Sequence, residues 1–136
     1  MSPKRRTDPQ VGRSALDTWC AADVCDSSSV DRQTLATAVR FTLEEFAHRH
    51  PGGSVEVRVP PFGVIQAVEG PKHTRGTPPN TVEADAHTWL ALVTGRLDFE
   101  DATRSHAVAA SGIRSDVSDL LPLFDPQGRA LAWLAH

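Results

Sequence analysis

The segment from residue 85 to residue 124 most constrains the fold, because its helix caps and helix stops are too closely spaced for any long element. Asp85 can accept hydrogen bonds from the free amides of a first helical turn, and it precedes Trp89 and further apolar residues at helical spacing. Gly95 supplies the left-handed residue that commonly follows a helix. Asp98 is placed to cap a second short helix. These features predict short helices packed closely together.

The end of this segment predicts one more strand and one more helix. Small residues from 107 to 111 form a strand candidate, and Ser115 or Asp116 is placed to cap a last helix. That helix would carry Leu120 and Leu121.

Upstream, apolar residues at helical spacing predict a longer helix over residues 32–48. Residues 54–59 alternate between valine and polar side chains, as a half-buried strand does. Pro60-Pro61 forces a turn, so residues 64–68 are predicted to pair with the first strand as a hairpin. Residues 81–84 suit a third short strand.

The two ends of the chain differ in character from its middle. Residues 1–30 are polar and irregular, with a short amphipathic turn around Leu16 and Trp19 at most, and we expect a flexible extension there. Residues 31–124 are expected to form the domain. Residues 125–136 form a C-terminal tail whose apolar Trp133 can dock on the domain or on a partner.

Composition excludes several classes of protein. The chain of 136 residues has a net charge of -3, which lacks the basic excess of nucleic-acid-binding proteins. No apolar stretch approaches the roughly 20 residues that span a bilayer, and no signal-peptide core follows the basic N-terminus, so a cytoplasmic protein is expected. Cys20 and Cys25 are too few for a disulfide framework and are expected to be reduced.

The order of these elements resembles the sterol carrier protein-like family. In that family an acidic residue is followed by an apolar helix, a Thr-Gly-Lys/Arg-Leu turn, a second helix, a strand and a leucine-rich end. The matching residues are Asp85, Trp89-Leu-Ala-Leu-Val93, Thr94-Gly95-Arg96-Leu97, Phe99-Glu-Asp-Ala102, Ala107 to Gly112 and Asp119-Leu-Leu-Pro-Leu-Phe124. The stretches 55–63 and 69–80 look like an actinobacterial, single-domain branch of the bacterial sterol carrier protein orthologues. The resemblance covers residues 31–124.

The resemblance implies an α+β fold, with a mixed sheet of about four to five strands and helices packed on one face. It also implies an apolar tunnel that holds a lipid without any cofactor, metal or catalytic group. The residues expected to line this tunnel are Val57, Ile65, Trp89, Val93, Leu97, Leu120, Leu121 and Phe124. The alternative for each of them is plain core packing, because a small domain needs most of its large apolar side chains to stay folded.

The loop from Lys72 to Asn80 is the sharpest polar feature. Lys72, His73 and Arg75 could form a polar rim for an anionic head group, or the loop could be structural, with Arg75 paired to Asp85 or another carboxylate. An enzyme would have to use dispersed residues such as His73 and Asp85, because no nucleophile elbow, phosphate loop or metal-ligand spacing is present.

The sequence therefore predicts a non-enzymatic carrier of a lipid or another hydrophobic small molecule. The alternative is a protein interaction module, such as a homodimer, that keeps the fold but has a filled core and binds through a sheet edge or through the C-terminal tail.

Overall fold

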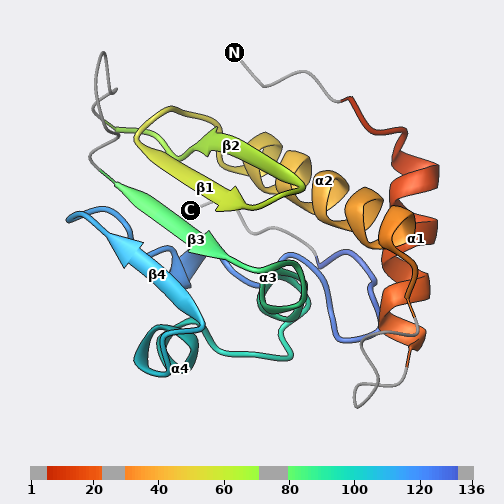
Figure 1. Cartoon of the computed structure of the whole chain (residues 1–136). Coiled ribbons are helices and arrows are strands. Elements are labelled where there is room, and N and C mark those ends of the chain that lie inside the picture. Colours follow the sequence, from red (N-terminus) through yellow and green to blue (C-terminus); the bar gives the residue numbers. More distant parts are fainter. Residues whose placement is uncertain (1–5, 23–29, 71–79, 132–136) are drawn as a thin grey trace.

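The computed structural model describes residues 6–22, 30–70 and 80–131, which form a four-stranded mixed sheet with helices packed against it. The elements in chain order are α1 (Pro9–Ala21), α2 (Arg32–Arg49), β1 (Val55–Val59), β2 (Gly63–Ala67), β3 (Thr81–Ala84), α3 (Ala86–Val93), α4 (Phe99–Arg104) and β4 (Val108–Ser111), followed by a 3-10 turn at Ser118–Leu120. The sheet order is β2-β1-β3-β4 (Figure 1). This architecture confirms the predicted α+β fold.

β1 is one of the two inner strands, and it pairs with its hairpin partner β2 on one side and with β3 on the other. Val57 pairs with Ile65 of β2 in antiparallel register and with Val82 of β3 in parallel register. The alternating sequence of β1 buries Val55, Val57 and Val59 on one face. Since β2 pairs only with β1 among the described strands, it forms an edge of the sheet.

α2 covers the buried face of the sheet and lies behind β1 and β2 in Figure 1. Phe46 of α2 packs edge-on against Trp89 of α3, with ring centroids 5.7 Å apart. The indole Nε1 of Trp89 donates to Oγ1 of Thr42 at 2.9 Å, so the buried indole N–H has a partner. These contacts fix α2 and α3 to each other over the sheet.

The predicted helix starts are confirmed by their caps. Asp85 accepts a hydrogen bond from the Thr88 amide at 2.8 Å, and Asp98 accepts one from the Asp101 amide at 3.3 Å. Gly95 follows α3 with a φ of +74°, a conformation that favours glycine.

The prediction of a last α-helix is wrong, because residues 115–121 contain only the 3-10 turn Ser118–Leu120. Asp116 accepts a hydrogen bond from the Ser118 amide at 3.0 Å, which closes a local turn instead of capping an α-helix. Pro122 follows directly and disfavours a helical conformation for the residue before it.

The N-terminal region also differs from the expectation of a flexible extension over residues 1–30. Its described part contains α1, which begins at the Asp8 cap and packs antiparallel to α2. Leu16 is fully buried and Trp19 is 9% exposed, so the helix contributes to the same core as the sheet. The residue that indicates this packing is Gly12, whose lack of a side chain lets α1 approach α2 closely. A Cβ at this position would lie 2.3 Å from Cγ of Phe41.

Candidate functional site

An apolar groove of about 650 Å³ runs between α2 and the edge strand β2. Its residues come from three separate parts of the chain, namely the start of the described chain, the middle of α2 and the β1–β2 hairpin. They are Arg6, Thr7, Arg40, Leu43, Glu44, Ala47, Phe62, Gly63, Val64 and Ile65. We call this set the α2–β2 groove.

The groove exists because the hairpin carries little bulk where it faces α2. Leu43 and Ala47 are each 1% exposed and form a closed apolar floor. Gly63 stands beside them, and a Cβ at this position would lie 3.1 Å from Cδ1 of Leu43. Any larger side chain at residue 63 would therefore enter the space between helix and strand.

The polar wall of the groove is held in place by one carboxylate. Glu44 Oε1 accepts hydrogen bonds from the backbone amides of Arg6 at 3.1 Å and Thr7 at 2.9 Å. Glu44 Oε2 accepts from the Thr7 hydroxyl at 3.1 Å. The chain that leads into α1 is thus fastened along one side of the groove.

Arginine side chains lie around Phe62, at the tip of the hairpin. Arg40 Nε donates to the Phe62 carbonyl oxygen at 3.1 Å. The guanidinium carbon of Arg32 lies 5.2 Å from the centroid of the Phe62 ring, within cation–π range. Positive charge therefore gathers at the apolar hairpin tip.

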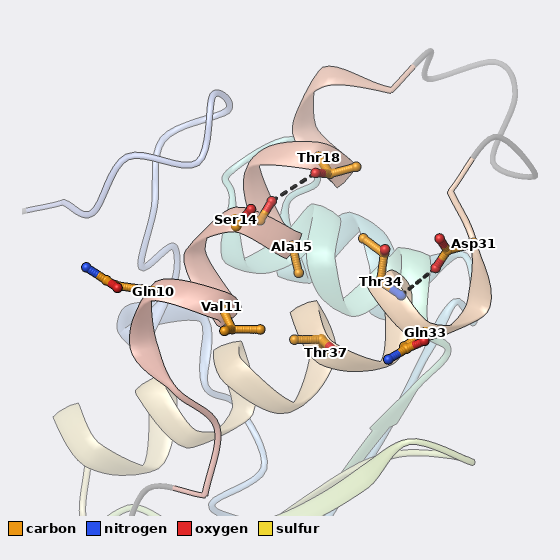
Figure 2. Close-up of a pocket in the computed structure, with 9 residues that line it drawn as sticks. All are labelled: Gln10, Val11, Ser14, Ala15, Thr18, Asp31, Gln33, Thr34 and Thr37. Atoms are coloured by element: carbon orange, nitrogen blue, oxygen red, sulfur yellow. Dashed lines mark hydrogen bonds between the residues drawn. The ribbon is translucent and has the colours of Figure 1, made fainter.

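A second pocket, of about 420 Å³, lies between α1 and α2 and is mainly polar at its rim (Figure 2). Val11 and Ala15 of α1 and Thr37 of α2 lie close to one another across it. The Thr18 hydroxyl donates to the Ser14 carbonyl at 2.9 Å, so that hydroxyl is used within α1 itself. This pocket is smaller and less apolar than the α2–β2 groove.

Comparison with known families decides what kind of protein this is. The model of the family described as bacterial SCP ortholog matches residues 31–123. The chain belongs to the bacterial SCP ortholog family. A search of curated proteins found no match.

In this SCP ortholog the matched segment supplies α2 and the hairpin, and therefore most of the α2–β2 groove. Arg6 and Thr7 lie outside the matched segment, as does the whole of α1. The polar wall therefore joins Glu44, inside the matched segment, to two residues outside it.

None of the three cavities given for the described residues brings the eight expected tunnel residues together. Ile65 lines the α2–β2 groove, whereas Leu97 and Leu121 line a small cavity of about 200 Å³ between the end of α3 and the 3-10 turn. Val57, Trp89, Val93 and Phe124 are buried in the core and line none of the three cavities described here. Leu120 packs against the same core while partly exposed.

The expected polar rim, Lys72, His73 and Arg75, lies outside the described residues. Asn80, at the end of that loop, connects two backbone segments. Its Nδ2 donates to the Ser54 carbonyl at 2.7 Å, and its Oδ1 accepts from the Arg114 amide at 2.9 Å. Asp85, the other expected partner of this loop, is the α3 cap.

Sequence reasoning missed the residues that build the groove. Arg40 and Glu44 are four residues apart on the polar side of the helix, where a charged pair is ordinary. Gly63 lies just before the predicted second strand, residues 64–68, and no role was expected for it. Only the packing of β2 against α2 shows that these residues share one space with Leu43.

The described residues offer no group of three or more His, Cys, Asp or Glu side chains that could hold a metal ion. Burial raises the pKa of the Cys20 thiol, which disfavours the reactive thiolate. Within the ranges that the structure covers, no helix is long and apolar enough to cross a bilayer.

Proposed function

We propose that this SCP ortholog binds a lipid or another hydrophobic small molecule reversibly in the α2–β2 groove. Membership of the family supports carriage of a hydrophobic ligand. The observation that supports the location is the groove itself, since its volume of about 650 Å³ falls in the range of small-molecule sites, roughly 300–1,000 Å³. The partly exposed side chains of Phe62 and Ile65 supply apolar surface, over a floor closed by the buried Leu43 and Ala47.

The binding energy would come from burial alone. Each methylene removed from water contributes about 0.8 kcal/mol, so eight buried methylenes would contribute roughly 6 kcal/mol before the cost of association. Such binding is reversible, and it needs neither a cofactor nor a catalytic group. The role of a carrier in the cytoplasm follows as part of the proposal.

The test is binding of dodecanol, measured by competition with a fluorescent hydrophobic probe, for the full chain and for Gly63→Val. The valine side chain would enter the groove beside Leu43, so the affinity should fall at least tenfold. Gln66→Val is the matched control, because Gln66 lies on the same strand, is exposed and does not line the groove. Circular dichroism establishes that both variants are folded.

A third variant separates the groove from the expected tunnel. Leu121→Asn alters the small cavity near the 3-10 turn and should leave dodecanol binding unchanged. Loss of binding in Leu121→Asn, with binding retained in folded Gly63→Val, would place the ligand at that cavity and refute the proposed site. Absence of any binding to the full chain would refute the function.

A homodimer formed through β2 is the second candidate, and a backbone observation favours it. The Glu56 amide donates to the Asn80 carbonyl at 3.0 Å, toward β3. Because backbone groups alternate in direction along a strand, the neighbours of Glu56 pair with β2, and the amides and carbonyls of Val64 and Gln66 point to the open edge. Two copies could join such edges antiparallel.

Analytical ultracentrifugation tests this candidate. Val64 is 56% exposed on the edge strand, so Val64→Lys would place a charge where a second strand would pair. The dimer hypothesis expects a dimeric full chain and a monomeric variant. A monomeric full chain at high micromolar concentration would rule it out.

A further inference from the structure

We infer that the α2–β2 groove selects a hydrocarbon chain that ends in a carboxylate, recognised by the guanidinium groups of Arg40 and Arg6. This inference rests on the proposed function and specifies the class of ligand. It follows from three properties of the groove: the direction of the Arg40 donors, the placement of Arg6, and the charge left over among the lining residues.

Arg40 is oriented by its own hairpin contact. Its Nε donates to the Phe62 carbonyl at 3.1 Å, which holds the guanidinium at the rim of the groove. Its two Nη atoms make no hydrogen bond or ion pair with any residue in the described ranges. Two neighbouring Nη donors match the two oxygens of a carboxylate, which is the geometry of a bidentate pair.

Arg6 is brought to the same rim through its backbone. Its amide donates to Glu44 Oε1 at 3.1 Å, so the residue lines the groove whatever its side chain does. Its guanidinium has no partner among the residues that the structure describes. The second cation is therefore available to an incoming anion.

The one carboxylate in the lining does not offset these two cations. Glu44 already accepts hydrogen bonds from two amides and one hydroxyl, and its position is fixed by them. Two arginines and one glutamate leave the groove lining with an excess of one positive charge. Arg32, stacked on Phe62, adds a further cation beside the rim.

An apolar floor with an unpaired cationic rim complements an anionic amphiphile. A neutral sterol would leave both guanidinium groups unused, and a cationic head group would be repelled. A carboxylate at the rim would place its hydrocarbon chain against the partly exposed Phe62 and Ile65, where burial gives the affinity.

The experiment compares four probes of equal chain length below their micelle concentrations: dodecanoate, dodecanol, dodecyl phosphate and dodecyltrimethylammonium. The readout is the ratio of dodecanoate affinity to dodecanol affinity for the full chain. Because the rim is exposed, a charge-assisted contact there should raise this ratio to about threefold to tenfold at low salt. The ratio should fall as salt screens the charges.

The double variant Arg6→Gln with Arg40→Gln should bring the ratio close to one. Arg129→Gln is the matched control, since Arg129 is exposed in the turn near the other end of α1 and its replacement should leave the ratio unchanged. If the double variant does not fold, Arg40→Lys alone serves, because lysine keeps the charge but loses the two-pronged donor and should lower the ratio.

The outcomes separate the two proposals. Equal binding of dodecanoate and dodecanol would overturn the selection of a carboxylate while leaving the proposed function standing. Tighter, arginine-dependent binding of dodecyl phosphate would overturn the carboxylate in favour of a phosphate. Failure of all four probes to bind would refute the proposed function itself.

Discussion

Replacement of Arg96 should weaken the attachment of α1 and of the segment that follows Phe124, because one guanidinium joins them. Arg96 Nη2 donates to the Cys20 carbonyl at 2.8 Å and to the Pro126 carbonyl at 2.6 Å, and Nε donates to the Pro126 carbonyl at 3.1 Å. The guanidinium carbon also lies 4.9 Å from the ring centroid of Trp19. The turn after α3 thus holds the last turn of α1 and the segment that follows Phe124.

The size of the effect follows from these contacts. A hydrogen bond from a charged donor contributes about 1.5–3 kcal/mol when buried, and about 1 kcal/mol is reasonable for each carbonyl here because Arg96 is half-buried and water can replace it. The cation–π contact adds about 0.5–1 kcal/mol. Arg96→Ala should therefore lower the free energy of unfolding by about 2–3 kcal/mol, which corresponds to roughly 8 °C in Tm for a chain of this size.

Urea unfolding followed by tryptophan fluorescence measures this change, and hydrogen exchange locates it. Exchange should rise in α1 more than in α3, because α3 keeps its contacts with α2. Arg104→Ala is the control: its ion pair with Asp101 at 3.1 Å joins side chains that are 74% and 62% exposed, so less than about 0.5 kcal/mol should be lost. A loss no larger for Arg96→Ala than for Arg104→Ala would refute the role of Arg96.

Two further predictions concern His50 and Gly12. Burial and the nearby charge of Arg49 lower the pKa of His50 below its ordinary value of 6.5, so the unfolded chain binds the proton more readily than the folded chain. The free energy of unfolding, measured by urea titration, should therefore fall as pH drops from 7.5 to 5.5. An equal fall in His50→Gln would contradict this. Gly12→Ala would place Cβ 2.3 Å from Cγ of the buried Phe41. This clash should lower the free energy of unfolding by about 1–3 kcal/mol, despite the higher helix propensity of alanine. Hydrogen exchange in α1 should become faster. Unchanged stability and exchange in Gly12→Ala would show that α1 does not pack there.

Much of the fold could be predicted from local patterns. The alternating valines of β1, the two prolines of the hairpin turn, and the caps Asp85 and Asp98 each act within a few residues of themselves. The third strand was predicted with its observed bounds for the same reason. Where a residue acts on a distant part of the chain, as Gly12 acts on Phe41, the sequence pattern gave no warning.

The candidate site was predicted less well, and the reason is physical. Apolar residues at regular spacing identify a buried surface, but they do not say whether another side chain or a ligand fills the space in front of it. Trp89 and Phe124 belong to the closed core, whereas Ile65 has the same apolar character and faces a groove. The difference depends on how fully the side chains between β2 and α2 fill the space, and Gly63, on the same strand as Ile65, places no side chain there.

The sequence by itself determined the order of the elements from α2 to β4, the starts of α3 and α4, and the α+β class, because capping, turn formation and amphipathic spacing depend on neighbours along the chain. Tertiary structure decided that α1 is part of the core, that Arg96 joins α1 to the segment after Phe124, and that Arg6, Arg40 and Leu43 share one groove. These facts depend on which surfaces meet in space. Residues 6 and 40 come together because α1 packs on α2 and Glu44 holds the start of the described chain against α2.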